Sequence, residues 1–319
     1  MVIPVILFFV GLALVVAGAD DLVDGASGIA RRAGLSEFVI GLTIVGMGTS
    51  APEMVVSLLG ALEGKGDVAV GNVVGSNIFN TLLILGLTAV LLPIGITSGN
   101  RRRDIPMNLL VTVLFIILGL EATLLGLGTD GLSRLDGAVL LLLFAGYMWI
   151  SFAKGKDSPD EEASGKRGLP LWRNIFKVIV GLAALAIGGK LFVDNATLIA
   201  SRLGISDKFI AITILAGGTS LPELATCVAA AAKKKGQLAL GNIIGSNIFN
   251  MLLILGVSSV IKPLSYQNIN LVDMGMLLLS ALLLLPAAVF PGKSKLGVAD
   301  GAVFLLVFAA YMAYLIINL

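Results

Sequence analysis

Residues Gly41–Gly86 read GLTIVGMGTSAPEMVVSLLGALEGKGDVAVGNVVGSNIFNTLLILG, and this stretch decides the fold because the chain contains it twice. Residues Ala211–Gly256 read AITILAGGTSLPELATCVAAAAKKKGQLALGNIIGSNIFNMLLILG and align with it without a gap at an offset of 170. Of the 46 aligned positions, 24 are identical, which is too many for two apolar segments that merely share a leucine-rich composition. The stretch is therefore an internal duplication.

The residues that the two copies share are polar, glycine-rich and helix-breaking. Both copies contain Gly-Thr-Ser-x-Pro-Glu and Gly-Asn-x-x-Gly-Ser-Asn-Ile-Phe-Asn. Such residues are costly inside a lipid bilayer, so their repeated presence indicates a function.

The composition is that of an integral membrane protein. Of the 319 residues, 57% are hydrophobic and 13% are charged, whereas roughly 25% are charged in an ordinary globular protein. The chain has no histidine and a single cysteine, Cys227. This excludes internal disulfides, Cys/His metal sites and a Ser-His-Asp triad. Carboxylates, hydroxyls, amides and backbone carbonyls remain, and these are ligands for hard cations.

The hydrophobicity pattern predicts an all-α protein with ten transmembrane helices, each long enough to cross a bilayer. Val2–Ala19 resembles a signal peptide, but no basic residue precedes it and it continues into Asp20 and Asp21 rather than into a small-residue cleavage site. It is therefore interpreted as part of the first helix. The ten expected helices span residues 2–31, 36–62, 67–92, 105–125, 133–153, 171–202, 206–233, 238–262, 270–290 and 296–317.

The duplication extends beyond the best-matched stretch. Asp24 pairs with Asp194 at the same offset, and the fifth and tenth helices share the sequence Asp-Gly-Ala-Val, which begins at Asp136 and at Asp300. The chain is thus predicted to consist of a five-helix repeat over 1–153, a cytoplasmic linker over 154–170 and a second repeat over 171–319. Because five is odd, the second repeat must be inverted in the membrane relative to the first.

Basic residues predict the orientation. The loops on one side of the membrane carry most of the lysines and arginines, and the positive-inside rule makes that side cytoplasmic. Both termini are then expected outside, in a multi-pass protein of the cell membrane. The basic residues on the heavier side are Arg31, Arg32, Arg101, Arg102, Arg103, Lys154, Lys156, Lys166, Arg167, Arg173, Lys177, Lys233, Lys234, Lys235, Lys293 and Lys295.

Prolines are expected to break the second and seventh helices. Pro52 and Pro222 cannot donate a hydrogen bond to the carbonyls of Gly48 and Gly218. Carbonyls freed at membrane depth persist only where protein, water or an ion satisfies them. We expect the second, third, seventh and eighth helices to be discontinuous and to form an ion-binding core.

A glutamate follows each proline, and polar residues recur beside it at helical spacing. Ser50, Glu53 and Ser57 lie on one helix face, and Ser220 and Glu223 repeat the pattern with Cys227 in the third place. Stripes with a spacing of four occur in the third and eighth helices, so four polar faces are predicted to meet. The stripes are Asn72, Ser76 and Asn80, and Asn242, Ser246 and Asn250.

The glutamates, serines, glycines and aspartates also have simpler interpretations. A glutamate in an apolar span can be a snorkelling or helix-end residue, and a serine can bond its own helix. Glycines such as Gly71 and Gly241 are expected to be packing surfaces. Asp24 and Asp194 are expected at solvated helix ends, with Lys190 paired to Asp194 at the i, i+4 spacing.

The motifs GTSAPE and GTSLPE, with GNVVGSNIFN and GNIIGSNIFN, closely resemble the two alpha-repeats of the cation/calcium antiporter (CaCA) superfamily, in particular the prokaryotic sodium/calcium exchangers. The resemblance implies that calcium binds at mid-membrane to Glu53 and Glu223 and to the carbonyls of Thr49 and Thr219. It implies sodium sites that use the same glutamates, and amides that line the centre. It further implies that potassium-dependent members carry an aspartate where this chain has Asn250. The remaining implied ligands are Gly46, Ser50, Ser76, Asn80, Ala216, Ser220 and Ser246.

We therefore predict a sodium/calcium antiporter that works by alternating access as a monomer, is no enzyme, and needs no cofactor and no nucleic acid. A proton/calcium antiporter is the nearest alternative, because glutamates can titrate, although its family motifs usually place the acidic residue differently in the Gly-Asn segment. A cation channel could use the same oxygens as a filter, but inverted repeats with broken helices favour alternating access. An intramembrane hydrolase based on Ser50 and Glu53 would lack a histidine to activate the serine.

Overall fold

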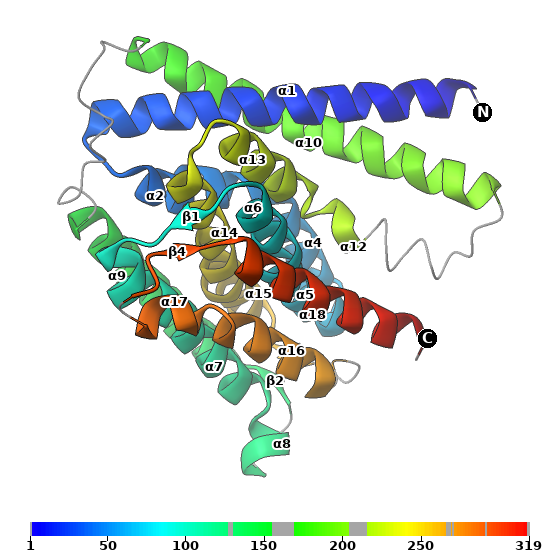
Figure 1. Ribbon diagram of the computed structural model, residues 1–319. Helices are drawn as coiled ribbons and strands as arrows, with labels where there is room; N and C mark the ends of the chain where they lie inside the picture. The colour runs from blue at the N-terminus through cyan, green and yellow to red at the C-terminus, as the bar shows by residue number, and fades with distance from the viewer. Residues whose placement is uncertain are drawn as a thin grey trace.

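The computed structural model is a bundle of helices with two very short strand pairs (Figure 1). It describes residues 2–126, 130–154, 169–203, 216–265, 269, 271–290 and 292–317. Most of the predicted linker, residues 155–168, and the first part of the predicted seventh helix, residues 206–215, lie outside the described residues.

The first half begins with one long helix and continues through shorter helical segments, several of them π-helical (η). Its elements are α1 (Val2–Ala33), α2 (Glu37–Ile40), η1 (Gly41–Val45), α3 (Gly46–Thr49), α4 (Ala51–Leu62), α5 (Gly66–Ile78), η2 (Phe79–Leu85), α6 (Gly86–Leu91), β1 (Ile94–Gly95), η3 (Asn100–Asp104), α7 (Ile105–Gly119), α8 (Glu121–Leu125), β2 (Gly131–Leu132) and α9 (Arg134–Lys154).

The second half repeats this order. Its elements are α10 (Leu171–Arg202), α12 (Ala216–Gly218), α13 (Leu221–Ala232), α14 (Gly236–Ile248), η6 (Phe249–Ile254), α15 (Leu255–Ile261), β3 (Leu264–Ser265), α16 (Leu271–Leu282), α17 (Leu285–Val289), β4 (Lys295–Leu296) and α18 (Val298–Ile317).

Within the described ranges, seven helices are long and apolar enough to cross a membrane, and an eighth span results if the bent pair 37–49 and 51–62 is counted as one. The protein is therefore an all-helical, multi-pass membrane protein. The prediction of ten spans is not reached by this measure. The described part of the seventh predicted helix consists of the short α12 and the 12-residue α13, and the fourth, predicted over 105–125, is divided between α7 and α8.

The prolines break two helices as expected, while the third and eighth helices differ from the prediction. The second helix bends by 49° between Thr49 and Ala51, and α12 ends at Gly218 before α13 begins at Leu221. The third and eighth helices run without a break over 66–91 and 236–261. The prediction that they are discontinuous is therefore wrong. Each polar motif lies in an α-helix, α5 or α14, and ends in a π-helical segment, with Asn80 in η2 and Asn250 in η6. π-helical turns are frequent at functional sites.

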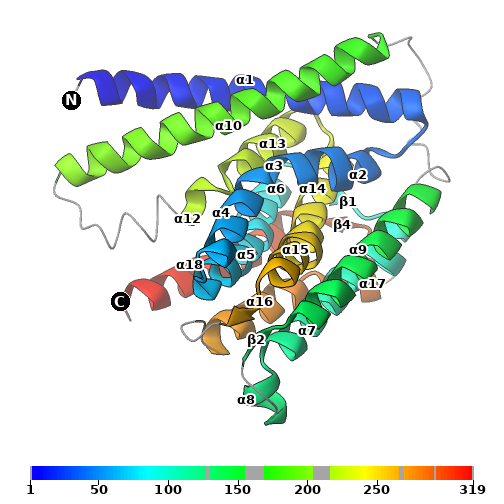
Figure 2. The ribbon, with the colours of Figure 1, turned by 180° about the vertical axis from the view of Figure 1, so that it is seen from behind.

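The core is formed by these two continuous helices. In the segment 66–91 72% of the apolar window is buried, and in 236–261 83%, against 17–33% in the other five long helices. Those five present apolar side chains such as Leu142 and Trp149 outward, as helices in contact with lipid do. Figure 2 shows α5, α14 and α15 inside the bundle and α9 at its edge.

The long helices α1 and α10 pack against each other along one side of the bundle (Figures 1 and 2). Glycines allow this contact: a Cβ added to Gly188 would lie 2.8 Å from the carbonyl oxygen of Gly11 and 2.7 Å from the Cβ of Leu14. A Cβ added to Gly18 would likewise lie 2.8 Å from the carbonyl oxygen of Gly181. Small residues at such positions let two membrane helices approach closely.

Gly188→Ala is therefore expected to lower the melting temperature of the protein in detergent, because overpacking a helix contact costs about 1–3 kcal/mol. Gly189 is the matched control, since an added Cβ there meets nothing within 4 Å. Gly189→Ala should be neutral or should stabilise the helix by up to about 1 kcal/mol. Equal melting temperatures for the two variants would contradict this account of the α1–α10 contact.

The last helix of each half packs against the other half. A Cβ added to Gly137 in α9 would lie 2.7 Å from the carbonyl oxygen of Gly256 in α15, and one added to Gly301 in α18 would lie 2.5 Å from that of Gly86 in α6. The short strands also pair between the halves: β1 of the first half pairs with β4 of the second, and β2 of the first half pairs with β3 of the second. This explains why the duplicated Asp-Gly-Ala-Val sequence contains a glycine: the two helices require a close backbone approach there.

Candidate functional site

The two helix breaks place the two glutamates at the starts of α4 and α13. Ser50 and Ser220 precede these helices with nearly identical backbone angles, φ −84° and ψ 10° at Ser50 and φ −87° and ψ 7° at Ser220. A proline follows in the first turn of each helix, where its missing N–H is not needed. Glu53 and Glu223 therefore sit in the first turn, near unpaired N–H groups that favour negative charge.

The serine of each half binds the glutamate of the other half. The Ser50 hydroxyl lies 2.8 Å from Glu223 Oε1, and the Ser220 hydroxyl lies 3.3 Å from Glu53 Oε1. Ser76 adds a third hydroxyl, 3.4 Å from Glu53 Oε1. All three hydroxyls donate to a carboxylate, so the predicted polar faces do meet and the two carboxylates share one site.

Both glutamates are completely buried, with 0% of their surface exposed. A snorkelling or helix-end glutamate would reach solvent, so that simpler interpretation is wrong for both residues. The same burial closes the site from both sides of the protein in this conformation. An ion can reach Glu53 or Glu223 only if helices around them move.

The other predicted ligands lie around the carboxylates in different ways. The carbonyl of Gly46 accepts hydrogen bonds from the Ser246 hydroxyl at 3.3 Å and from the Ser50 N–H at 3.1 Å. The Thr49 hydroxyl lies 3.2 Å from Asn242 Oδ1 and 3.4 Å from the carbonyl oxygen of Gly46. Thr219 directly precedes Ser220. Ala216 is the first residue of the short helix α12. 

Among the residues that the structure describes, four buried oxygens at this site have no hydrogen-bond donor. They are Glu53 Oε2, Glu223 Oε2, Asn80 Oδ1 and Asn250 Oδ1. A hydroxyl can turn and find a partner, but an ionised carboxylate and an amide oxygen can only accept. Buried acceptors without a donor are costly and call for an explanation. Since these four form two pairs related by the offset of 170, the explanation must apply to both halves, and a bound cation provides it.

The charge of the site fits a divalent cation. Among the described residues, no group of three or more His, Cys, Asp or Glu side chains comes together. Glu53 and Glu223 supply two negative charges, which balance one divalent ion. With the two amide oxygens they offer up to six ligands, and calcium takes about six to eight.

Asn80 and Asn250 do not bond to the carboxylates but pair with two further asparagines. Asn80 Nδ2 lies 3.3 Å from Asn247 Oδ1, and Asn250 Nδ2 lies 3.0 Å from Asn77 Oδ1. Sequence reasoning missed Asn77 and Asn247, because neither lies on the predicted stripes with a spacing of four. The signal was present, since both belong to the duplicated Gly-Ser-Asn-Ile-Phe-Asn motif.

The outer ends of the stripes have supporting roles. Asn72 Nδ2 lies 3.0 Å from the Ser57 hydroxyl and 3.2 Å from the carbonyl oxygen of Glu53. In the other half, Asn242 Nδ2 lies 3.3 Å from Cys227 Sγ, so the cysteine takes the place of Ser57. These bonds attach α4 to α5 and α13 to α14 beside each glutamate.

Asp24 and Asp194 form ion pairs, but they lie inside the 32-residue helices α1 and α10 and not at helix ends as predicted. Lys190 lies 2.9 Å from Asp194, which confirms the predicted i, i+4 pair. Asp24 is half-exposed and contacts Lys177 and Lys233 at 3.3 and 2.6 Å. Partial burial acts to lower the pKa of Lys233, but its bonds to Asp20 and Asp24 raise that pKa above its ordinary value. Asp24 is therefore already neutralised and is no cation ligand in this conformation.

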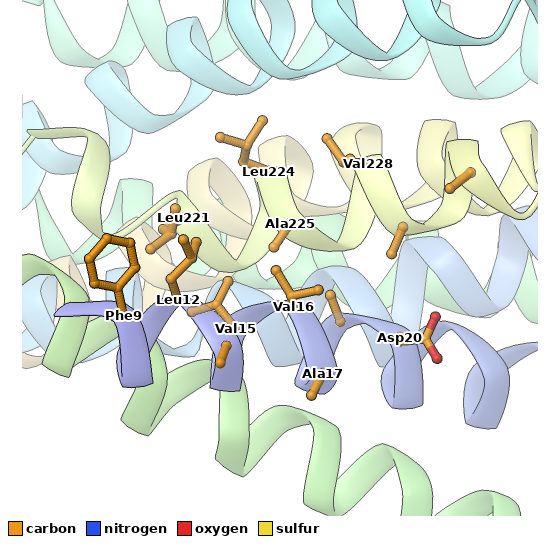
Figure 3. A pocket seen from close by; sticks show the side chains of 14 residues that line it. Phe9, Leu12, Val15, Val16, Ala17, Asp20, Leu221, Leu224, Ala225 and Val228 are labelled. Atoms are coloured by element: carbon orange, nitrogen blue, oxygen red, sulfur yellow. The ribbon is translucent and has the colours of Figure 1, made fainter. Parts of the chain in front are cut away.

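A groove of about 900 Å³ lies between α1 and α13 (Figure 3). Apolar side chains such as Leu12 and Leu224 line most of it, and Asp20 stands at one end. Leu221 lines the groove two residues before Glu223, yet Glu223 has no exposed surface. The groove therefore does not open into the carboxylate site in this conformation, and its walls offer a hydrated cation few ligands.

Comparisons with known proteins agree with this site. The model of the family described as sodium/calcium exchanger protein matches residues 3–153 and 174–317. A putative antiporter, CaxA of Alkalimonas amylolytica, is 43% identical over 270 residues, which cover 82% of each chain. The sodium/calcium exchanger MaX1 of Methanosarcina acetivorans is 34% identical over 302 residues, which cover 83% of this chain and 85% of that protein.

The fold is also similar to that of a solved exchanger. A structure of the sodium-calcium exchanger NCX_Mj, soaked with sodium and strontium, superposes with a TM-score of 0.85 at 36% identity and covers 98% of this chain and 99% of that one. The family match extends over both halves and includes both glutamate motifs. This chain therefore belongs to the sodium/calcium exchanger family, whose members are transporters and not enzymes.

Proposed function

We propose that this protein exchanges sodium for calcium across a membrane by alternating access, with both ions bound at mid-membrane by Glu53 and Glu223. The observation that carries the proposal is the set of four buried acceptor oxygens without donors, on Glu53, Glu223, Asn80 and Asn250. The proposed ligands also include four serine hydroxyls, four backbone carbonyls and water. The hydroxyls are those of Ser50, Ser76, Ser220 and Ser246, and the carbonyls are those of Gly46, Thr49, Ala216 and Thr219.

The charges of the site explain why such a carrier would exchange ions rather than leak. Without a cation, two ionised carboxylates would share a fully buried site, which desolvation and mutual repulsion both disfavour. The empty protein would therefore convert between its two orientations very slowly. Bound calcium or sodium neutralises the site and permits the movement, so transport in one direction requires return transport of a second ion.

Alternating access requires two halves that can exchange roles, and several contacts support ten spans in two inverted repeats. The reciprocal bonds Ser50–Glu223 and Ser220–Glu53 and the reciprocal strand pairs relate the halves by an approximate two-fold axis. Such an axis in the membrane plane is the mark of inverted-repeat transporters. With the basic loops on the cytoplasmic side, both termini would lie outside a cell membrane. One chain contributes both glutamates, so we propose a monomer as the working unit.

The test is calcium flux into proteoliposomes under imposed gradients. An outward sodium gradient at clamped pH should drive calcium uptake, because the hydroxyls of Ser50, Ser76, Ser220 and Ser246 can ligate a small cation but add nothing to proton binding. Full activity in sodium-free buffer under a pH gradient would instead establish a proton/calcium antiporter. Calcium uptake with no gradient of any counter-ion would indicate a channel.

A further inference from the structure

Four asparagines from the two Gly-Ser-Asn-Ile-Phe-Asn segments meet at the contact of the third and eighth helices. They are Asn77, Asn80, Asn247 and Asn250, and none has more than 2% of its surface exposed. Each of the two predicted ligands, Asn80 and Asn250, donates its amide N–H to an asparagine of the other half.

The orientation of the Asn250 amide is fixed by Asn77, which is itself hydrogen-bonded to the backbone. Asn77 Nδ2 lies 3.2 Å from the backbone carbonyl oxygen of Asn247. A carbonyl oxygen can only accept, so Asn77 must direct its NH2 group there and its Oδ1 toward Asn250. Asn77 Oδ1 can only accept as well, so Asn250 must present Nδ2 to it, at 3.0 Å. The remaining atom of the Asn250 amide, Oδ1, then points away from this contact and has no donor.

We propose that Asn77 is a positioning residue which holds the Asn250 amide with its oxygen, rather than its NH2 group, toward the transported cation. This inference rests on the proposed function, because it assumes that Asn250 Oδ1 is a cation ligand. An amide oxygen attracts a cation, whereas a reversed amide would present two N–H groups with partial positive charge and repel it. An asparagine at position 250 is therefore not sufficient for binding. Its amide must also present the oxygen, and not the NH2 group, to the cation.

In the other half, the Asn80 amide is oriented by Asn247 in the same way but less firmly. Asn247 Oδ1 accepts from Asn80 at 3.3 Å, but Asn247 Nδ2 is anchored at 2.9 Å on the hydroxyl of Thr81. A hydroxyl can donate as well as accept, so Thr81 fixes the Asn247 amide less firmly than a carbonyl fixes Asn77. The duplicated position of Thr81 is occupied by Met251, which is why the two halves differ here. The Asn77–Asn250 pair is accordingly the one to test.

A double-mutant cycle separates amide orientation from a simple structural tie between the helices. In Asn250→Asp, both terminal atoms of the side chain are oxygens, so an oxygen faces the cation whichever way the group turns. Asn77→Leu should therefore weaken calcium binding when residue 250 is asparagine. It should not weaken binding in the Asn250→Asp background, where the acceptor Asn77 Oδ1 would only face another acceptor oxygen. The quantity to measure is the KM for calcium in sodium-driven flux, with potassium present on both sides to balance the added charge of Asn250→Asp.

The expected result is a rise in the calcium KM of about 10- to 100-fold for Asn77→Leu alone, the usual effect of losing a group that orients a metal ligand. In the Asn250→Asp background the rise should be no more than about twofold, within the error of additivity. The maximal flux and the melting temperature without calcium should change little. Asn195→Leu is the control for loss of a buried amide, because Asn195 bonds only to the carbonyl of Leu191 in its own helix; its calcium KM should equal that of the wild type.

Two results would overturn the proposal: an equal rise of the calcium KM in both backgrounds, which would make Asn77 a structural tie alone, and no rise in either. Failure of the proposed function gives a different pattern. If Asn250→Leu leaves the calcium KM unchanged, Asn250 is not a ligand and the site assignment itself is wrong.

Discussion

Glu53→Gln is expected to abolish calcium exchange and to leave the protein folded. The substitution removes one of the two negative charges of the site and one ligand oxygen, but it preserves nearly the same side-chain volume. A divalent ion in the variant would carry an uncompensated charge in a fully buried site. Removing one partner from a buried charge pair costs roughly 3–5 kcal/mol, so calcium should bind more than about a hundredfold more weakly. Glu223→Gln should have the same effect, because each glutamate has an equivalent hydroxyl donor.

The measurement is sodium-driven calcium flux in proteoliposomes, with the melting temperature as a check of folding. The matched control is Glu63→Gln, since Glu63 follows the same helix, α4, but is exposed and paired with Lys65 at 2.6 Å. Glu63→Gln should transport at the wild-type rate. Near-normal flux in Glu53→Gln or Glu223→Gln would show that the two buried carboxylates are not the transport site.

Calcium exchange is expected to proceed without potassium. The described part of the site contains two carboxylates and no third acidic group, so bound calcium already brings its charge to zero. Asn80 and Asn250 contribute neutral amide oxygens. A further cation would bring an unbalanced charge into a buried site, which is strongly unfavourable.

Asn250→Asp should create a demand for an extra cation, because it adds a third negative charge beside Glu53 and Glu223. Sodium-driven calcium flux is to be measured with choline in place of potassium on both sides. The wild type should be unaffected by the replacement, whereas the variant should lose most of its flux in choline and recover it with potassium. A wild-type flux that collapses in choline and returns with potassium would show that the charge count is wrong.

The sequence predicted the two glutamates and the helix breaks beside them better than the number and bounds of the surrounding helices. Glu53 and Pro52 are out of place in an apolar helix, and their repetition at Glu223 and Pro222 left few interpretations other than a broken helix around a site. The serine donors followed from helical spacing. The contacts of Asn77 could not be predicted, because Asn77 lies off the polar stripe with a spacing of four. Its partner Asn250 lies in the π-helical segment η6, where the spacing of side chains changes and leaves no trace in the hydrophobicity pattern.

The number of spans was harder to predict for a related reason. The segments 66–91 and 236–261 lie mostly inside the protein but are still apolar enough to be found by hydropathy, and both were predicted. Conversely, α7 and α13 are short helices that join polar or broken segments, so the length of an apolar run in the sequence does not give the length of the helix. The duplication, by contrast, was evident because Gly-Ser-Asn-Ile-Phe-Asn has no reason to recur by chance.

Because α9 and α18 each pack against the other half of the chain, neither half has a complete core of its own. The last helix of each half packs on the partner, the strands of each half pair with the partner's strands, and α1 packs along α10. The gene segment that was duplicated is thus not a unit that can fold alone. An ancestral single copy would have needed a second copy before it possessed a core. For the same reason, residues 1–153 produced without residues 171–319 should be unstable in the membrane, and the two pieces expressed together should recover each other.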